Sequence, residues 1–332
     1  MMHKDWLEKP YYTLDAYCKN RFGYKCYKVA LNAHMTCPNR DGTVDHRGCI
    51  FCSAGGSGDF ALDINVTNSD EQIIETAIDK QLQKGVEALA QKFTLSQEPC
   101  IIAYFQAYTN TYAPLPYLKE IYTQALSHPK VCGISIATRP DCLPELVLDL
   151  LSQLQSAFPE KFIWIELGLQ TIHEDTARYI RRGYPLSTFE EACRNLKQRN
   201  IPFIVHIILG LPGEDASRLL QTIQYLNELE PFGVKLQLLH ILKDTDLAIA
   251  FEKGEVHALT KEAYLDMLIM CLAHLNPGIV IHRVTGDGPK KLLLSPLWSG
   301  NKRDVLNTLH KKMRESGIHQ GSLWSNSPDT NR

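Results

Sequence analysis

Several features that would place this 332-residue sequence in a simple class are missing from it. No stretch of about 18 apolar residues occurs, which excludes a helical membrane span. Met1–Pro10 carries charges rather than an apolar core, which argues against a signal peptide. The formal net charge is −2, so no global positive field indicates a nucleic-acid partner. We therefore expect a cytoplasmic protein with no membrane association.

Two nucleotide-binding motifs are also absent. The glycine-rich Gly55–Gly58 lacks the Gly-x-Gly-x-x-Gly register and a helix directly behind it, so a dinucleotide fingerprint is not supported. No Gly-x-x-x-x-Gly-Lys-Ser/Thr occurs, which argues against ATP hydrolysis. The sequence does contain ten cysteines. Without a secretion signal these argue against a disulfide framework and favour a metal or cluster site.

Short apolar runs alternate with helical patterns between residues 25 and 241. The candidate strands are Cys26–Leu31, Cys100–Gln106, Val131–Thr138, Phe162–Gln170, Phe203–Leu211 and Val234–Ile241. Ser69 or Asp70 is expected to cap a helix over Glu71–Phe93, and Ser187 with Glu190 forms a capping box for a helix that reaches Arg199. Such strands predict a parallel sheet covered on both faces. Periodicity alone leaves open a doubly wound sheet or a partial barrel.

The pattern changes after residue 241, and we divide the chain accordingly. A helix over Thr260–His274, a strand around Ile279–Thr285 and a basic helix near Lys302–Glu315 are expected. Residues 1–24 form an N-terminal extension, 25–241 the main domain and 242–320 a C-terminal extension. Residues 321–332 lack an apolar period and are expected to be a disordered tail.

The strongest chemical signal follows the first expected strand. Eleven residues separate Cys37 from Cys49, and two separate Cys49 from Cys52. Soft thiolates select zinc or an iron–sulfur cluster. A closed zinc site would need His34 or His46 as a fourth ligand, a redox Cys-x-x-Cys would leave Cys37 unexplained, and buried free cysteines are a further alternative. Three thiolates on a four-iron cluster leave one iron open for a substrate.

The Cys49-Ile-Phe-Cys52 ending after a first strand resembles the radical S-adenosylmethionine (SAM) superfamily. The eleven-residue gap departs from the usual three but is typical of the branch around the Elongator catalytic subunit. Residues 28–57 resemble its small bacterial YtqA/YhcC-type (MnmL-like) relatives. The resemblance implies an α/β fold, a radical-SAM partial (βα)6 TIM-like barrel with a short α/β C-terminal extension. It also implies a [4Fe–4S] cluster on Cys37, Cys49 and Cys52.

The resemblance further implies that SAM is cleaved to a 5′-deoxyadenosyl radical with an electron from a flavodoxin- or ferredoxin-type donor. Candidate SAM-binding residues at the strand ends are Phe51, Gln106, Thr109, Asn110, Arg139, Glu166, Gln170, Arg178 and His206. A charged residue inside a buried strand is costly unless paired, so Glu166 is expected to point into the barrel mouth. His206 stands where the superfamily has a glycine, and a buried structural histidine is an equal alternative.

The resemblance suggests tRNA as the substrate, with tailoring of an existing side chain on the wobble uridine U34, such as conversion of carboxymethylaminomethyluridine to aminomethyluridine. The 332 residues leave no room for the acetyltransferase domain of the Elongator subunit. A C-terminal basic segment could neutralise phosphates. Its candidate tRNA-binding residues are Lys290, Lys291, Lys302, Arg303, Lys311 and Lys312. A solvated charged face, a small-metabolite substrate and a non-catalytic zinc adaptor remain alternatives.

The remaining cysteines lack ligand spacing and are expected to be dispensable for the cluster. They are Cys18, Cys26, Cys100, Cys132, Cys142, Cys193 and Cys271. Trp298 and Tyr108 are candidates for stacking a flipped-out base, with packed aromatic residues as the alternative. The oligomeric state is left open.

Overall fold

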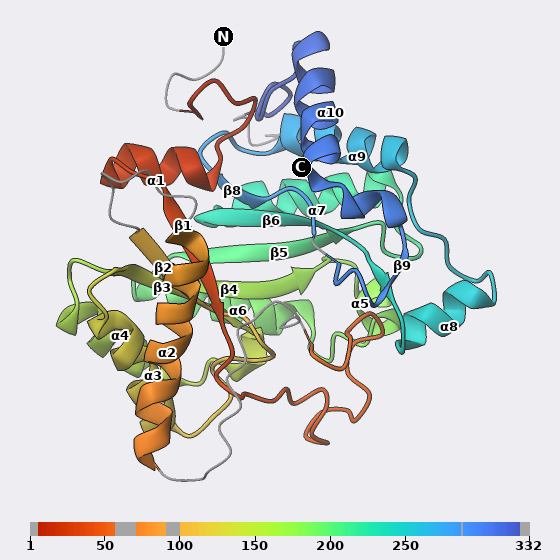
Figure 1. The fold of residues 1–332 in the computed structure, drawn as a ribbon. Coiled ribbons are helices and arrows are strands. Elements are labelled where there is room, and N and C mark those ends of the chain that lie inside the picture. Colours follow the sequence, from red (N-terminus) through yellow and green to blue (C-terminus); the bar gives the residue numbers. More distant parts are fainter. Residues whose placement is uncertain (1–5, 57–70, 91–99, 287, 326–332) are drawn as a thin grey trace. The chain divides into compact units, whose positions relative to one another are not determined.

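The computed structural model describes residues 6–56, 71–90, 100–286 and 288–325 (Figure 1). The described residues divide into two compact units. The cysteine-loop unit comprises 22–168 and 181–204, and the terminal unit comprises 1–21, 169–180 and 205–332, each within its described part. All residues of the Cys37–Cys52 loop fall in the first of these units.

Seven strands of the described chain form one sheet in the order β1-β2-β3-β4-β5-β6-β8. Their bounds are β1 (Cys26–Leu31), β2 (Cys100–Phe105), β3 (Val131–Thr138), β4 (Phe162–Gln170), β5 (Phe203–Leu209), β6 (Gly233–Leu238) and β8 (Val280–Arg283). The neighbouring pairs from β1 to β4 and the pair β6–β8 run parallel. Six strands lie where the sequence predicts them, with small shifts at their ends. The fold is the expected partial barrel, and β8 adds a seventh parallel strand.

The helices connect the strands and cover them. They are α1 (Leu14–Phe22), α2 (Glu71–Ala90), α3 (Leu115–Ser127), α4 (Glu145–Ala157), α5 (Glu174–Tyr179), α6 (Leu186–Gln198), α7 (Ala216–Leu229), α8 (Asp246–Glu252), α9 (Lys261–His274) and α10 (Lys302–Glu315). Short 3-10 helices are η2 (Pro140–Cys142) and η3 (Leu297–Gly300). Within the described residues, no helix is both long and apolar enough to cross a bilayer.

Apolar burial holds the strands of the cysteine-loop unit in place. Every residue of β2 is buried, as expected for a central strand with helices on one face and the barrel interior on the other. Helix α2 packs against β1, and α3 packs against α2, β3 and α4 (Figure 1). Gly85 of α2 allows this close approach, because a Cβ atom there would lie 2.4 Å from Cγ1 of Val29.

One predicted helix start is wrong. Helix α6 begins at Leu186 after Pro185, and no side chain caps its first turn. Ser187 therefore lies inside the helix, because Pro185, with a ψ of 164°, already occupies the extended N-cap position. The helix predicted over Thr260–His274 is α9, and Thr260 is its N-cap, with its hydroxyl accepting from the Ala263 N–H at 3.2 Å. Ser69, Asp70 and the end of the predicted helix at Phe93 lie outside the described residues.

In the terminal unit, residues near both chain ends pack together. The Ile281 N–H of β8 donates to the Tyr12 carbonyl at 2.7 Å. Gln320 joins the two ends, since its Oε1 accepts from the Tyr12 N–H at 2.9 Å and its own N–H donates to Pro10 at 2.9 Å. A two-stranded antiparallel ladder, β7 (Ile241–Leu242) with β9 (Leu293–Ser295), completes the unit.

The first part of the predicted tail contacts α9. The N–H groups of Gly321 and Leu323 donate to the carbonyls of Leu272 and Ala273 at 3.0 and 2.8 Å. Residues 321–325 are thus held by backbone hydrogen bonds. The rest of the predicted tail, 326–332, lies outside the described residues.

Candidate metal centre

The cysteine loop, residues 32–56, folds on itself directly after β1. The N–H of Arg40 donates to the Cys37 carbonyl at 2.8 Å, and the N–H of Gly48 donates to the Asn39 carbonyl at 2.7 Å. A further turn brings the Cys52 N–H to the Cys49 carbonyl at 3.1 Å. These short-range bonds place all three predicted ligands on one compact loop despite the eleven-residue gap.

Asn39 is the buried anchor of this loop. Its Nδ2 donates to the carbonyl of Arg181 at 2.6 Å and lies 3.4 Å from Sγ of Cys49. Its side chain is 1% exposed, and its Oδ1 has no hydrogen-bond partner among the described residues. Gly183 packs against the same amide, since a Cβ there would lie 2.6 Å from Oδ1. Residues 181–183, which are distant from the cysteine loop in sequence, therefore contact its buried asparagine and help to hold the shape of the loop.

Arg40 and Tyr108 hold the end of the loop. The guanidinium of Arg40 donates to the carbonyls of Cys52 and Ser53 at 3.0 and 2.6 Å. Its Cζ stands 5.9 Å from the ring centre of Tyr108, whose hydroxyl donates to Ala54 at 2.5 Å. Tyr108 is therefore packed against the loop, which favours the structural alternative over base stacking.

The three cysteines influence one another electrostatically. A hydrogen bond from Cys52, with the Arg139 and Arg40 charges, lowers the pKa of the Cys49 thiol to about 7. The same hydrogen bond raises the pKa of Cys52, and the charge of Cys37 adds to that increase. Of this hydrogen-bonded pair, Cys49 is therefore the thiol that is more readily deprotonated.

The donor set of this loop consists of three thiols with positive charge nearby. Among the described residues, the three loop sulfurs do not form a group whose atoms all lie within 4.8 Å of one another. Thiolates of a four-iron cluster bind different irons and so stand farther apart than thiolates that share one ion. The three thiols, the Asn39 amide and the nearby arginines suit an anionic, sulfur-rich group.

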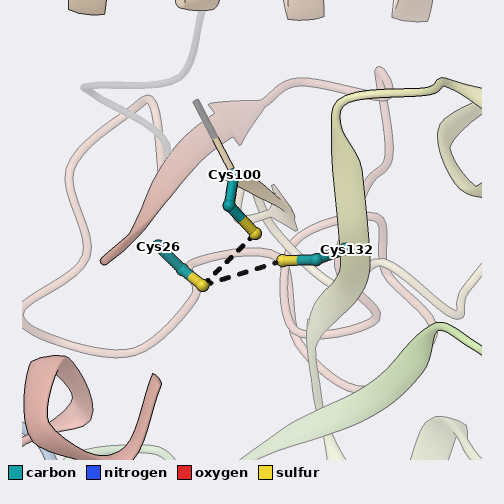
Figure 2. Close-up of side chains that lie close together, drawn as sticks. All are labelled: Cys26, Cys100 and Cys132. Atoms are coloured by element: carbon teal, nitrogen blue, oxygen red, sulfur yellow. Dashed lines mark hydrogen bonds between the residues drawn. The ribbon is translucent and has the colours of Figure 1, made fainter. Parts of the chain in front are cut away.

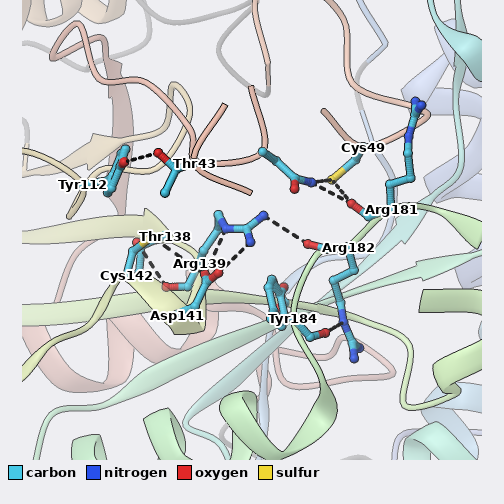
Figure 3. Close-up of polar contacts among 12 residues, drawn as sticks. Thr43, Cys49, Tyr112, Thr138, Arg139, Asp141, Cys142, Arg181, Arg182 and Tyr184 are labelled. Atoms are coloured by element: carbon cyan, nitrogen blue, oxygen red, sulfur yellow. Dashed lines mark hydrogen bonds and ion pairs between the residues drawn. The ribbon is translucent and has the colours of Figure 1, made fainter. Parts of the chain in front are cut away.

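Arg139 follows β3 and points toward the cysteine loop. It forms a bidentate ion pair with Asp141, at 2.9 and 2.7 Å, and donates to the Arg182 carbonyl at 3.1 Å (Figure 3). The ring of Tyr184 lies 4.9 Å from its guanidinium carbon. Arg139 is 8% exposed, so it is a buried side chain. It is a fixed positive charge beside Cys49.

The polar residues after β2 join the strand ends. Asn110 is fully buried, and its Nδ2 and N–H both donate to the Ala137 carbonyl at 3.0 Å. The N–H of Thr109 donates to Thr36 of the cysteine loop at 3.2 Å. Gln106 is half-buried, and its N–H donates to Leu31 at 3.3 Å. All three lie at the end of the sheet from which the cysteine loop extends.

Glu166 of β4 is buried, with 1% exposure, and it forms an ion pair inside the unit. Its Oε1 accepts from Lys28 Nζ at 2.6 Å and from Ser135 Oγ at 2.6 Å. Lys28 Nζ also lies 4.7 Å from the ring centre of Tyr104. The sequence predicted that Glu166 points into the barrel mouth and contacts SAM, and it did not identify Lys28 as the partner of this carboxylate. That lysine lies 138 residues away.

Three other residues that the sequence predicts to bind SAM belong to the terminal unit. His206 of β5 is half-buried, and its Nδ1 lies 3.2 Å from Gln237 Nε2 of β6. Gln170, at the end of β4, has a positive φ of 61°. Arg178 of α5 is exposed. Phe51, by contrast, lies half-buried in the Cys49–Cys52 turn of the cysteine-loop unit.

The predicted basic segment lies on and before α10. Lys290, Lys291, Lys302, Arg303 and Lys311 are exposed. Lys312 is half-buried and forms an ion pair with Asp266 of α9 at 2.6 Å. Trp298 donates from Nε1 to Leu259 at 3.0 Å and packs near Tyr264, which favours a packed role over base stacking.

Parallel βα units with a three-cysteine loop directly after β1 offer a place for a metal cluster at the end of a partial barrel. The chain belongs to the radical SAM superfamily, since residues 45–226 match the Radical SAM superfamily and residues 231–315 match the Radical_SAM C-terminal domain. It is therefore an enzyme that uses a [4Fe–4S] cluster and reductively cleaves SAM. A non-catalytic zinc adaptor does not agree with this membership.

Relatives place the chain in the Elongator-like branch of this superfamily. It is 40% identical to "Uncharacterized protein YtqA" of Bacillus subtilis, over 96% of this chain and 94% of that protein. It is 34% identical to "Protein YhcC" of Escherichia coli, over 91% and 92%. Elongator complex protein 3 of Danio rerio is 24% identical, and the match covers 88% of this chain and 59% of the length of that protein.

The fold agrees with a solved structure of the same branch. The archaeal Methanocaldococcus infernus Elp3 matches with a TM-score of 0.64 and 15% identity, covering 89% of this chain. This chain spans 64% of that protein's length. At this identity the likeness concerns the fold alone.

Proposed function

We propose that Cys37, Cys49 and Cys52 hold the [4Fe–4S] cluster. The observation that carries the proposal is the compact loop, which brings three cysteines together under one buried asparagine. When bound, the cluster supplies the electron that breaks the S–C5′ bond of SAM. Asn39 orients the Cys49 sulfur, and Arg139 offsets negative charge beside it. Asn39 and Arg139 are themselves buried, whereas the three cysteines are half-buried.

SAM is expected to contact residues at the loop end of the strands. The strongest candidates are Gln106, Thr109, Asn110 and Arg139, because they adjoin the cysteine loop, with Phe51 in the ligand turn. We expect the Glu166 carboxylate to hold the side chain of Lys28, its ion-pair partner, in place. Gln170, Arg178 and His206 stay candidates from the sequence pattern.

Anaerobic reconstitution tests the ligand assignment. The full chain should bind about four irons per molecule and form 5′-deoxyadenosine from SAM under reduction. Cys37→Ala, Cys49→Ala and Cys52→Ala should each lose the iron. Cys193→Ala and Cys271→Ala remove buried thiols elsewhere and serve as matched controls. A full cluster in Cys49→Ala protein would overturn the assignment.

We further propose that the substrate is tRNA with a modified U34 side chain, for example carboxymethylaminomethyluridine. The likeness to Elongator complex protein 3 and the exposed cations around α10 support this choice. The test is mass spectrometry of tRNA nucleosides from a strain that lacks the protein. Accumulation of one U34 nucleoside, reversed by the wild-type chain but not by Cys49→Ala, is expected. An unchanged nucleoside profile would favour a small-metabolite substrate.

The reaction also needs a reductant and a reducing compartment. All ten cysteines lie among the described residues and none is in a disulfide, which suits the cytoplasm. A flavodoxin- or ferredoxin-type protein is the expected electron donor. Reduced flavodoxin replacing dithionite in the 5′-deoxyadenosine assay would support this, and no turnover with either carrier would contradict it.

A further inference from the structure

A second group of cysteines lies at the opposite end of the same strands. Cys26 begins β1, Cys100 begins β2, and Cys132 is the second residue of β3 (Figure 2). Cys26 and Cys100 are direct partners in the parallel register. Six steps along β1 at about 3.3 Å each place this end about 20 Å from the start of the cysteine loop. The two groups are therefore separate.

The three sulfurs converge on one point. Sγ of Cys26 lies 3.3 Å from that of Cys100 and 3.9 Å from that of Cys132 (Figure 2). All three lie within 4.8 Å of one another. Thiolates that share one tetrahedral ion at about 2.3 Å stand about 3.8 Å apart. The spacing thus fits a single ion, in contrast to the cysteine loop.

The surroundings allow an ion to enter and be held. Cys100 is buried, while Cys26 and Cys132 are half-buried, so the group is reachable from solvent. The Tyr24 hydroxyl hydrogen-bonds to Cys100, and Tyr24 is 44% exposed. Lys161, whose charge interacts with Cys132, can offset the excess negative charge of three thiolates on a divalent ion. Its ammonium is fixed by the carbonyl of His128 at 2.9 Å.

We propose that Cys26, Cys100 and Cys132 bind one thiophilic metal ion, of which zinc is the representative, independently of the iron–sulfur cluster. A water molecule or the Tyr24 hydroxyl completes the coordination. The ion joins the starts of three neighbouring strands, and so stabilises the sheet whose other end carries the cysteine loop. Nothing in this proposal depends on the substrate or on SAM cleavage.

The test measures zinc directly on the full chain. The reconstituted protein is incubated with zinc chloride, excess metal is removed, and zinc and iron are counted by elemental mass spectrometry. We expect one zinc per chain in the wild type and in Cys49→Ala. Loss of even an outer-shell partner lowers metal affinity about 10- to 100-fold, so Cys26→Ser and Cys132→Ser should lower it by at least about 100-fold. Cys193→Ser is the matched control.

A second measurement separates ligand loss from misfolding. Circular dichroism of the metal-free variants should match the wild type, and zinc should raise the Tm of the wild type but not of Cys132→Ser. When the chain is loaded with cadmium in place of zinc, its cadmium-113 NMR chemical shift should indicate three thiolate ligands. The proposal is overturned if wild-type protein retains no zinc, if zinc is lost in Cys49→Ala but kept in Cys26→Ser, or if Cys26 and Cys100 form a disulfide that excludes the metal.

Discussion

Asn39 donates a 2.6 Å hydrogen bond to the carbonyl oxygen of Arg181, a residue 142 positions away. The same amide nitrogen lies 3.4 Å from Sγ of Cys49. One buried side chain therefore couples the proposed cluster loop to the segment that follows α5. Because this contact bridges distant parts of the chain, the shape of the loop depends on residues outside the cysteine motif.

Asn39→Ala should weaken cluster retention. The change removes the Asn39 donor from the carbonyl of half-buried Arg181, to which Sγ of Cys49 stays only a weak donor at 3.6 Å. A loss of about 1–3 kcal/mol of unfolding free energy is expected. Urea unfolding of the apo-protein gives that value, and iron release to a chelator gives the effect on the cluster. Thr43→Ala is the control. Thr43 lies on the same loop as Asn39, and the change removes only an exposed hydroxyl contact to Tyr112. Equal iron release from the two variants would contradict the anchoring role.

Gly183→Ala should disturb the same contact from the other side. Gly183 has a φ of +82°, and its added Cβ would meet the Asn39 Oδ1 at 2.6 Å. Gly254→Ala is a matched control, since Gly254 has a φ of +74° with no atom within 4 Å of its added Cβ. Both variants carry left-handed strain of about 1 kcal/mol, but only Gly183→Ala should lose iron faster than wild type. Identical stability and iron release would rule out the steric contact.

Lys28→Met should destabilise the chain more than a comparable surface change. It leaves the Glu166 carboxylate buried without its cation, for which a loss of about 3 kcal/mol is expected. Lys19→Met removes an exposed helical ion pair with Asp15 and should change stability by less than about 1 kcal/mol. The double variant Lys28→Met/Glu166→Leu should recover much of the loss. Chemical denaturation provides the comparison, and equal effects at Lys28 and Lys19 would refute it.

Charge reversal on α10 should weaken tRNA binding if the proposed substrate is right. Lys302→Glu with Arg303→Glu should lower affinity and reduce the salt slope of binding by about 2, since each phosphate contact contributes about 0.9. Lys80→Glu with Lys84→Glu changes two exposed lysines on α2 and is the control. Filter binding across a salt series measures both. Salt-independent binding, or equal losses in the two variants, would remove α10 from the footprint.

The strands were predictable because each is a short apolar run bounded by polar turns. The bounds of β1, β3 and β4 agree with the sequence pattern, and α10 spans the predicted Lys302–Glu315. The start of α6 was not predicted, because a capping box and a proline boundary compete over the same few residues. The number of strands in the barrel could not be predicted either. A strand near β8 was expected, but nothing in its sequence indicates that it pairs with β6.

The candidate site was predictable only in its local part. The spacing of Cys37, Cys49 and Cys52 carries a signal because these ligands share one loop. Cys26, Cys100 and Cys132 carry none, although the structure brings their sulfurs together, because strand register and not sequence distance makes them neighbours. The roles of Asn39 and Gly183 were hidden for the same reason. Their partners become visible only once the chain has folded.

The bond between Tyr12 and Gln320 has a consequence for the order in which the protein is made. A ribosome releases residue 12 early and residue 320 only after 308 further positions, so this contact of the terminal unit cannot form until residue 320 has been made. The cysteine-loop unit ends at residue 204 and needs none of that later sequence for its internal contacts. Domains tend to fold as units during synthesis. The cysteine loop can therefore fold on the nascent chain before Tyr12 has formed its hydrogen bond with Gln320.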